Sequence, residues 1–166
     1  NPFSYEDSPV QSQVPTLFRT TDLLPNLDVR VIVASPEVYA GTAGGLFKQE
    51  GDQFVSTPLQ GEVRDLVLVH QQVFAAMDEA LALINDQDVG LETPLGAPAR
   101  GIASDGSIVF IAADNGVWQY DGSLTQRSTQ PMKDVAVDSQ GRLWAAGTGL
   151  YRWDGTQWQD ESAGLP

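Results

Sequence analysis

Short stretches of β-branched and other apolar residues, separated by turn residues, run along most of the chain. The clearest of these stretches are VRVIVA (29–34), DLVLV (65–69), IVFIA (108–112) and DVAVD (134–138). Apolar runs of this length, bounded by turn residues, are typical of β-strands. In YDG (120–122) and WDG (153–155) an Asp-Gly pair follows an aromatic residue, which predicts two-residue hairpin turns. The chain is therefore predicted to be all-β.

The strand pattern recurs in four units, at approximately 27–61, 62–97, 98–130 and 131–166. Aligning the units gives one aromatic column, Tyr39, Phe74, Phe110 and Trp144, and one aliphatic column, Leu46, Leu81, Val117 and Leu150. Each unit holds about four short strands, and such a sheet must stack against its neighbours to bury its faces. The predicted fold is a β-propeller of about four four-stranded antiparallel blades, as a small closed ring or as an arc of a larger propeller. The aromatic column is expected to fill the space between blades.

The fourth unit carries the most specific pattern, MKDVAVDSQGRLWAAGTGLYRWDGTQWQDESAGLP (132–166). Its order of strand, aromatic residue, Gly-Leu, Asp-Gly and closing Gly-Leu-Pro resembles the propeller repeat of the periplasmic sensor regions of two-component regulators. The first and third units match this repeat in part and the second poorly, so the resemblance covers roughly residues 16–166. It implies a ligand-receiving or partner-binding ectodomain, and hence a periplasmic or extracellular location.

The two ends of the chain bear on whether the ring closes. TLFRTTDLLP (16–25) parallels TQWQDESAGLP (156–166), which predicts an extra outermost strand at 16–20 ahead of the four units. Two alternatives stay open: a closed four-bladed ring, and an arc completed by further blades, another chain or self-association. Residues 1–13 show no periodicity and contain two prolines, so we expect an extended arm before blades that occupy 14–166.

Composition narrows the function. The 22 acidic and 9 basic residues give a formal net charge of −13, so we expect no nucleic-acid partner and no direct membrane insertion. The chain has no cysteine and a single histidine, His70, which excludes disulfides, thiolate catalysis and multi-histidine metal sites. Asp86 and Asp88 form only a fragment of a calcium-binding loop, and an ordinary polar turn is the alternative. No nucleotide-binding or nucleophile motif is present.

Four of the nine bases occupy one repeat position, Arg30, Arg64, Arg100 and Lys133. This position opens the predicted innermost strand, so radial symmetry would gather the bases at one mouth of the channel. A small anionic ligand or the carboxylates of a partner would suit such a mouth. The alternative is that each base pairs with a nearby carboxylate, since Asp28, Asp65 and Asp134 lie beside the column.

The second unit departs from the repeat. Met77, Asp78 and Glu79 replace its small pair and glycine, and Ala82 stands where the other units have an aromatic residue. A partner interface at the first three residues is one explanation, and drift of a tolerant repeat is the other.

These features together predict a non-enzymatic binding module without a cofactor, an accessory or sensor-type propeller that docks onto a protein partner or a larger assembly. The alternative is a propeller-based lyase or glycosidase. That enzyme would need carboxylates, His70 or a metal to converge at the channel mouth.

Overall fold

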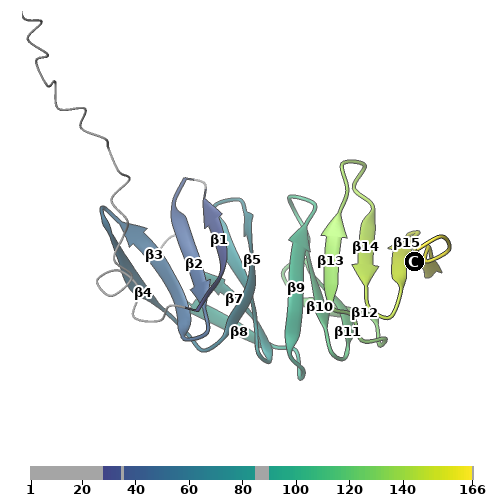
Figure 1. Ribbon diagram of the computed structural model, residues 1–166, viewed down its shortest axis with the longest axis horizontal. Coiled ribbons are helices and arrows are strands. Elements are labelled where there is room, and N and C mark those ends of the chain that lie inside the picture. The colour runs from purple at the N-terminus through teal and green to yellow at the C-terminus, as the bar shows by residue number, and fades with distance from the viewer. Residues whose placement is uncertain (1–27, 35, 85–89, 166) are drawn as a thin grey trace, which may run out of the picture.

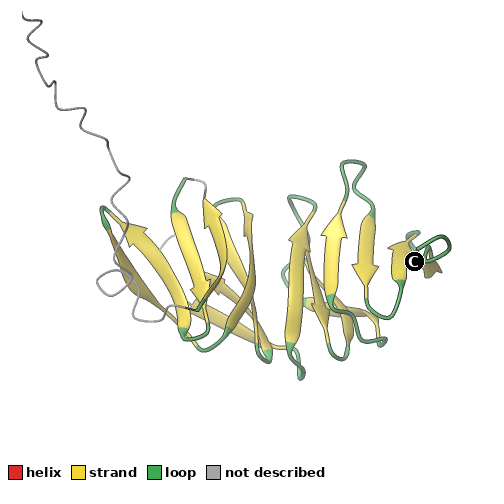
Figure 2. Ribbon diagram, in the orientation of Figure 1, coloured by secondary structure: helices red, strands yellow, loops and turns green. Residues whose placement is uncertain are grey.

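The computed structural model describes residues 28–34, 36–84 and 90–165. In this part of the chain the strands form four antiparallel sheets of four strands each, and every sheet follows chain order. Figure 2 shows these strands joined by loops and turns. No helix within it is long and apolar enough to cross a membrane. The predicted arm at 1–13, the extra strand at 16–20, and Asp86 and Asp88 lie outside the described residues.

Each sheet is a simple meander joined by hairpins. The first holds β1 (Val29–Ala34), β2 (Val38–Thr42), β3 (Gly45–Glu50) and β4 (Gln53–Gln60). The second holds β5 (Val63–Val69), β6 (Gln72–Met77), β7 (Ala80–Ile84) and β8 (Gly90–Pro94). The third holds β9 (Ala99–Ser104), β10 (Val109–Ala113), β11 (Gly116–Tyr120) and β12 (Leu124–Ser128). The fourth holds β13 (Asp134–Val137), β14 (Leu143–Ala146), β15 (Leu150–Trp153) and β16 (Trp158–Asp160).

Consecutive sheets stack side by side in the manner of propeller blades. Their first strands supply most of the contact between sheets, β1 with β5, β5 with β9, and β9 with β13. Figure 1 shows the sheets following one another from purple to yellow, with the first and the fourth at opposite ends of the row. The described strands therefore form an open arc of four blades, and the predicted all-β propeller architecture is confirmed.

Three buried apolar clusters lie between successive sheets. In each cluster the preceding sheet contributes its aromatic and aliphatic column residues: Tyr39 with Leu46, Phe74 with Leu81, and Phe110 with Val117. The following sheet contributes mainly residues of its first two strands: Val63, Leu66 and Val73; Ala99, Ile102 and Ile111; Met132, Val135 and Leu143. Burying a side chain of this size contributes about 1.5–3 kcal/mol. The prediction that the aromatic column fills the space between blades is confirmed for its first three members.

The two predicted Asp-Gly hairpins are longer than expected. Tyr120 pairs with Leu124, and Trp153 pairs with Trp158, so the predicted two-residue turns are wrong and the loops hold three and four residues. The structure places a two-residue turn elsewhere, at His70 and Gln71 between β5 and β6.

Candidate functional site

The four bases of the repeat position lie at the start of the first strand of each sheet, with Lys133 directly before β13. Arg30 pairs with Asp28 of its own sheet at 3.0 Å and with Glu62 of the second sheet. The other oxygen of Glu62 lies 2.9 Å from Arg64 Nη2, so one carboxylate joins the bases of two neighbouring sheets. Arg64 pairs in addition with Asp78, also at 2.9 Å.

The third base is paired as well, whereas the fourth has no ion pair within the described part of the chain. Arg100 Nε donates to Asp114 Oδ1 at 2.8 Å, and this interaction lowers the pKa of the Asp114 carboxyl below its ordinary value. In the alignment of the units Thr148 takes the place of Asp114, and Lys133 has no ion pair among the described residues. The arginines of this repeat position are therefore already paired with carboxylates. A small anionic ligand at this position stays a prediction.

Two of the carboxylates that the sequence places beside the column have other partners. Asp65 accepts hydrogen bonds from the backbone N–H groups of Leu66 and Ile102, and Asp134 accepts one from Val135. The carboxylates that neutralise Arg64 and Arg100 instead come from Glu62 and from the turns after β6 and β10.

The irregular segment of the second unit lines a hollow of about 340 Å³, to which Met77, Asp78 and Glu79 all contribute. Met77 is only 5% exposed and packs into the cluster between the first two sheets, while Asp78 and Glu79 are exposed. Of these three residues, only Asp78 and Glu79 are thus accessible. A partner at this position stays a prediction.

His70 lies away from the base column. It occupies the exposed β5–β6 turn, whereas Arg64 lies near the beginning of β5, so the two are near opposite ends of one strand. The structure does not bring His70 together with the carboxylates of the column.

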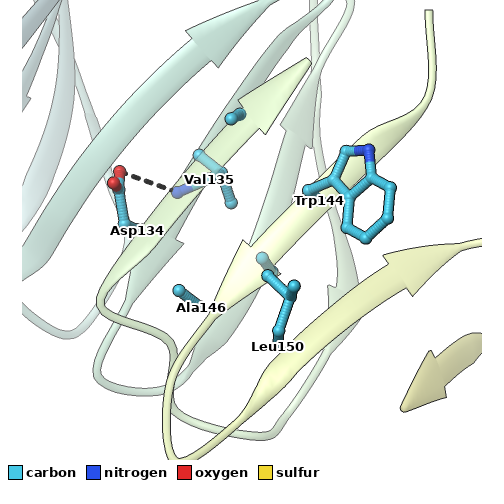
Figure 3. A pocket seen from close by; sticks show the side chains of 7 residues that line it. Asp134, Val135, Trp144, Ala146 and Leu150 are labelled. Carbon is cyan, nitrogen blue, oxygen red and sulfur yellow. Dashed lines mark hydrogen bonds between the residues drawn. The ribbon is translucent and has the colours of Figure 1, made fainter. Parts of the chain in front are cut away.

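The outward face of the fourth sheet is an apolar surface that no described sheet covers. Its members are Ala136 on β13, Trp144 and Ala146 on β14, and Leu150 on β15, and a shallow pocket of about 210 Å³ lies over them. Figure 3 shows Trp144 and Leu150 on the same face of neighbouring strands, with Asp134 turned away from the indole ring. We call these four residues the open face.

The repeat shows why the open face is unusual. Trp144 belongs to the aromatic column, whose other members, Tyr39, Phe74 and Phe110, are 5%, 4% and 9% exposed. Leu150 belongs to the aliphatic column, whose other members, Leu46, Leu81 and Val117, are at most 2% exposed. In the first three sheets these columns are buried by the next sheet, but Trp144 and Leu150 remain partly exposed.

Charged groups hold the indole ring of Trp144 in place. Its Nε1–H donates to Asp138 Oδ2 at 3.0 Å, and the same carboxylate accepts from Arg142 Nε at 2.6 Å. The guanidinium groups of Arg142 and Arg152 lie 5.8 and 5.9 Å from the ring centre, within the range of cation–π attraction. These hydrogen bonds, led by that of the indole, hold the pKa of the Asp138 carboxyl well below its usual range. An oriented aromatic ring with a charged rim is typical of the centre of a protein interface.

The sequence predicted the aromatic column but placed Trp144 among its buried members. What distinguishes Trp144 is that its sheet is the last of the described sheets, so that none of them packs over this face. Two other tryptophans of this sheet, Trp153 and Trp158, pack against each other across β15 and β16 with ring centres 5.4 Å apart.

No protein-family model matches the chain, and no curated protein matches it. Solved structures do match. The extracellular domain of a putative hybrid two component system from B. thetaiotaomicron has a TM-score of 0.70 and 14% identity, over 84% of this chain and 22% of that one. Virginiamycin B lyase from Staphylococcus aureus has a TM-score of 0.71 and 14% identity, over 87% of this chain and 59% of the lyase. The computationally designed Ika4 protein has a TM-score of 0.66 and 16% identity, over 79% of this chain and 94% of Ika4.

These similarities establish the β-propeller fold, including its resemblance to the extracellular domains of sensor proteins. The chain spans about a fifth of the length of those sensor domains and somewhat more than half of the lyase.

Proposed function

We propose that the protein is a non-enzymatic binding module, an extracytoplasmic propeller of the sensor type that docks onto a protein partner through the open face. The observation that carries this proposal is the partial exposure of Trp144 and Leu150, whose counterparts in the other three sheets are buried.

The energetics of the open face favour a protein partner. Each large apolar side chain that is fully removed from water contributes about 1.5–3 kcal/mol, and part of that gain is still available at Trp144 and Leu150. Because Asp138 and the two guanidinium groups already orient the indole ring, little conformational entropy is lost when a partner covers it. The shallow, apolar shape fits a β-sheet face or a flat apolar surface better than an ion.

Two further observations support this proposal over the lyase or glycosidase alternative. General acid–base chemistry needs its groups within hydrogen-bond reach of one reacting atom, and His70 lies near the far end of β5 from Arg64 and its carboxylates. The resemblance to sensor ectodomains supports the extracytoplasmic location and the sensor type.

Site-specific photocrosslinking in the cells that produce the protein tests the proposal. We expect a photoreactive phenylalanine analogue in place of Leu150 or Ala136 to crosslink to one defined protein. The same analogue in place of Thr125, which is exposed on β12 and far from the open face, should not. Crosslinking at all three positions alike, or at none, would contradict docking through the open face. Fractionation of the same cells tests the location, and a purely cytoplasmic product would contradict that part of the proposal.

A further inference from the structure

The first sheet exposes apolar side chains at its opposite end of the arc. Val29 and Ile32 on β1 are 39% and 60% exposed. The residues equivalent to Val29 in the other sheets, Val63, Ala99 and Met132, are at most 1% exposed. The residues equivalent to Ile32, Leu66, Ile102 and Val135, are 5–6% exposed. Ala40 and Phe47, farther out on the same sheet, are buried, so this exposed patch is confined to β1.

Each end of the arc thus presents half of an interface that the chain forms three times internally. At every internal boundary, the counterparts of Val29 and Ile32 in the following sheet share a buried cluster with the counterparts of Trp144 and Leu150 in the preceding sheet. On the open face, Trp144 and Leu150 have no described counterparts of Val29 and Ile32 packed against them. On β1, Val29 and Ile32 have no described counterparts of Trp144 and Leu150 packed against them. Strand β1 is therefore the surface that the repeat matches to the open face.

The charges at the two ends match in the same way. At the first internal boundary Arg30 pairs with Glu62, which stands two positions before Arg64 and pairs with that base too. The residue equivalent to Arg30 in the fourth sheet is Lys133, which has no ion pair among the described residues. The residue equivalent to Glu62 in the first sheet is Asp28, which pairs with Arg30 of its own sheet as Glu62 pairs with Arg64. If β1 covered the open face, Lys133 would meet Asp28 as Arg30 meets Glu62.

We propose that the open face of one copy of this chain is covered by strand β1 of a second copy, with Lys133 of the one paired to Asp28 of the other. This inference deepens the proposed function and rests on it, since it names the protein that covers the open face. A contact between two different surfaces closes into a ring when the rotation allows it. Two copies give eight blades, the upper end of the usual propeller range of about four to eight, so the assembly is a two-copy ring with two identical interfaces.

Sedimentation equilibrium of the full chain tests the inference over about 1–100 µM, a range that covers weak and moderate protein affinities. We expect a mass that tends to twice the 17.9 kDa of the chain. Ile32→Glu and Leu150→Glu should each give monomers, because either change places a carboxylate in both interfaces of the ring. Leu91→Glu is the matched control, since Leu91 is 55% exposed on the outer strand β8 and should leave the mass unchanged.

Mixing the two monomeric variants distinguishes this assembly from other dimers. The Ile32→Glu chain keeps an intact open face and the Leu150→Glu chain keeps an intact β1, so an equimolar mixture should associate one to one through a single interface. Lys133→Glu should weaken association, and adding Asp28→Lys to the same chain should restore it. Circular dichroism of each variant verifies that these exposed substitutions leave the sheets folded.

Several results would overturn the inference. A wild-type chain that remains monomeric throughout this range would overturn it, and this is also the result expected if residues 1–27 of the same chain covered the ends. Dissociation by Leu150→Glu but not by Ile32→Glu would show that two open faces pair with each other, and a mass above two copies would exclude the two-copy ring. A monomeric chain that still crosslinks at position 150 to another protein would remove this inference and leave the proposed function standing. A monomeric chain without crosslinks would remove both.

Discussion

The carboxylate of Asp65 reaches from the second sheet to the third, where it accepts a hydrogen bond from the backbone N–H of Ile102 at 3.0 Å. Its other oxygen accepts from the backbone N–H of Leu66 at 2.9 Å. At the next boundary the arrangement is reversed. The equivalent of Asp65 is Gly101, and a Cβ atom there would lie 2.4 Å from Oδ1 of Asp134 in the fourth sheet. One carboxylate thus lies at each of these two boundaries, but it comes from opposite sides.

Asp65 should make the protein less stable as pH rises. Burial raises the pKa of the Asp65 carboxyl above its ordinary value, and the charge of Asp134 adds to this, although the two backbone hydrogen bonds oppose it. A carboxyl with a raised folded pKa contributes stability below its unfolded pKa of about 3.9 and loses it as pH rises through the folded pKa. We expect wild-type protein to lose stability relative to Asp65→Asn as the pH rises from about 4 through the raised folded pKa. Urea unfolding of both proteins across this range measures the difference, and a difference that grows in favour of wild type would contradict the prediction.

Asp138 should have the opposite effect on the pH dependence of stability. Hydrogen bonds from Trp144, Arg142 and Gln140 lower the pKa of its carboxyl, so its contribution to stability is present above the unfolded pKa and is lost as pH falls. We expect Asp138→Asn to destabilise the protein at pH 7 and to lose this effect below about pH 4. Urea unfolding followed by tryptophan fluorescence measures the destabilisation at pH 7 and its loss at low pH. Asp138→Asn with an unchanged penalty at low pH would show that the charge of Asp138 is not involved.

The repeat made much of the fold predictable. Tyr39, Phe74 and Phe110 recur at a fixed spacing because each fills the same space between two sheets, so their burial follows from the sequence alone. Trp144 has the same sequence signal, but no described sheet follows its own, so its exposure depends on its place in the described arc and not on any local pattern. The partner of Arg100 could not be predicted from the sequence either, because Asp114 lies 14 residues away and reaches the base only across the β9–β10 pairing.

Turn geometry was less predictable for a different reason. Gly122 and Gly155 adopt positive φ angles, as the Asp-Gly pairs suggested, but the loops around them are longer than two residues. The two-residue turn at His70 and Gln71 has no sequence signal, because neither residue type favours the left-handed backbone that both adopt, with φ of 48° and 67°.

Removing the backbone strain in the turn at His70 and Gln71 should stabilise the protein. A residue other than glycine in the left-handed region costs on the order of 1 kcal/mol, which glycine avoids. We expect Gln71→Gly to raise the free energy of unfolding by about 0.5–1 kcal/mol, measured by urea denaturation. Gln140→Gly is the matched control, because Gln140 is exposed in a turn and does not have a positive φ. That control should lower stability by increasing the freedom of the unfolded chain, and equal effects of the two changes would contradict the prediction.

Alanine substitutions at two glycines distinguish the cost of backbone strain from the cost of a steric clash. Gly116 and Gly122 both have positive φ, at 132° and 106°, so alanine is strained at either position. A Cβ atom at Gly116 would lie 1.8 Å from the backbone oxygen of Ser128, whereas one at Gly122 would meet nothing within 4 Å. We expect Gly122→Ala to cost about 1 kcal/mol from the backbone alone. Gly116→Ala should cost at least twice as much, because β11 must also move away from the end of β12. Chemical denaturation of both variants measures the two costs, and equal losses would mean that the close approach of Gly116 to Ser128 relaxes without penalty.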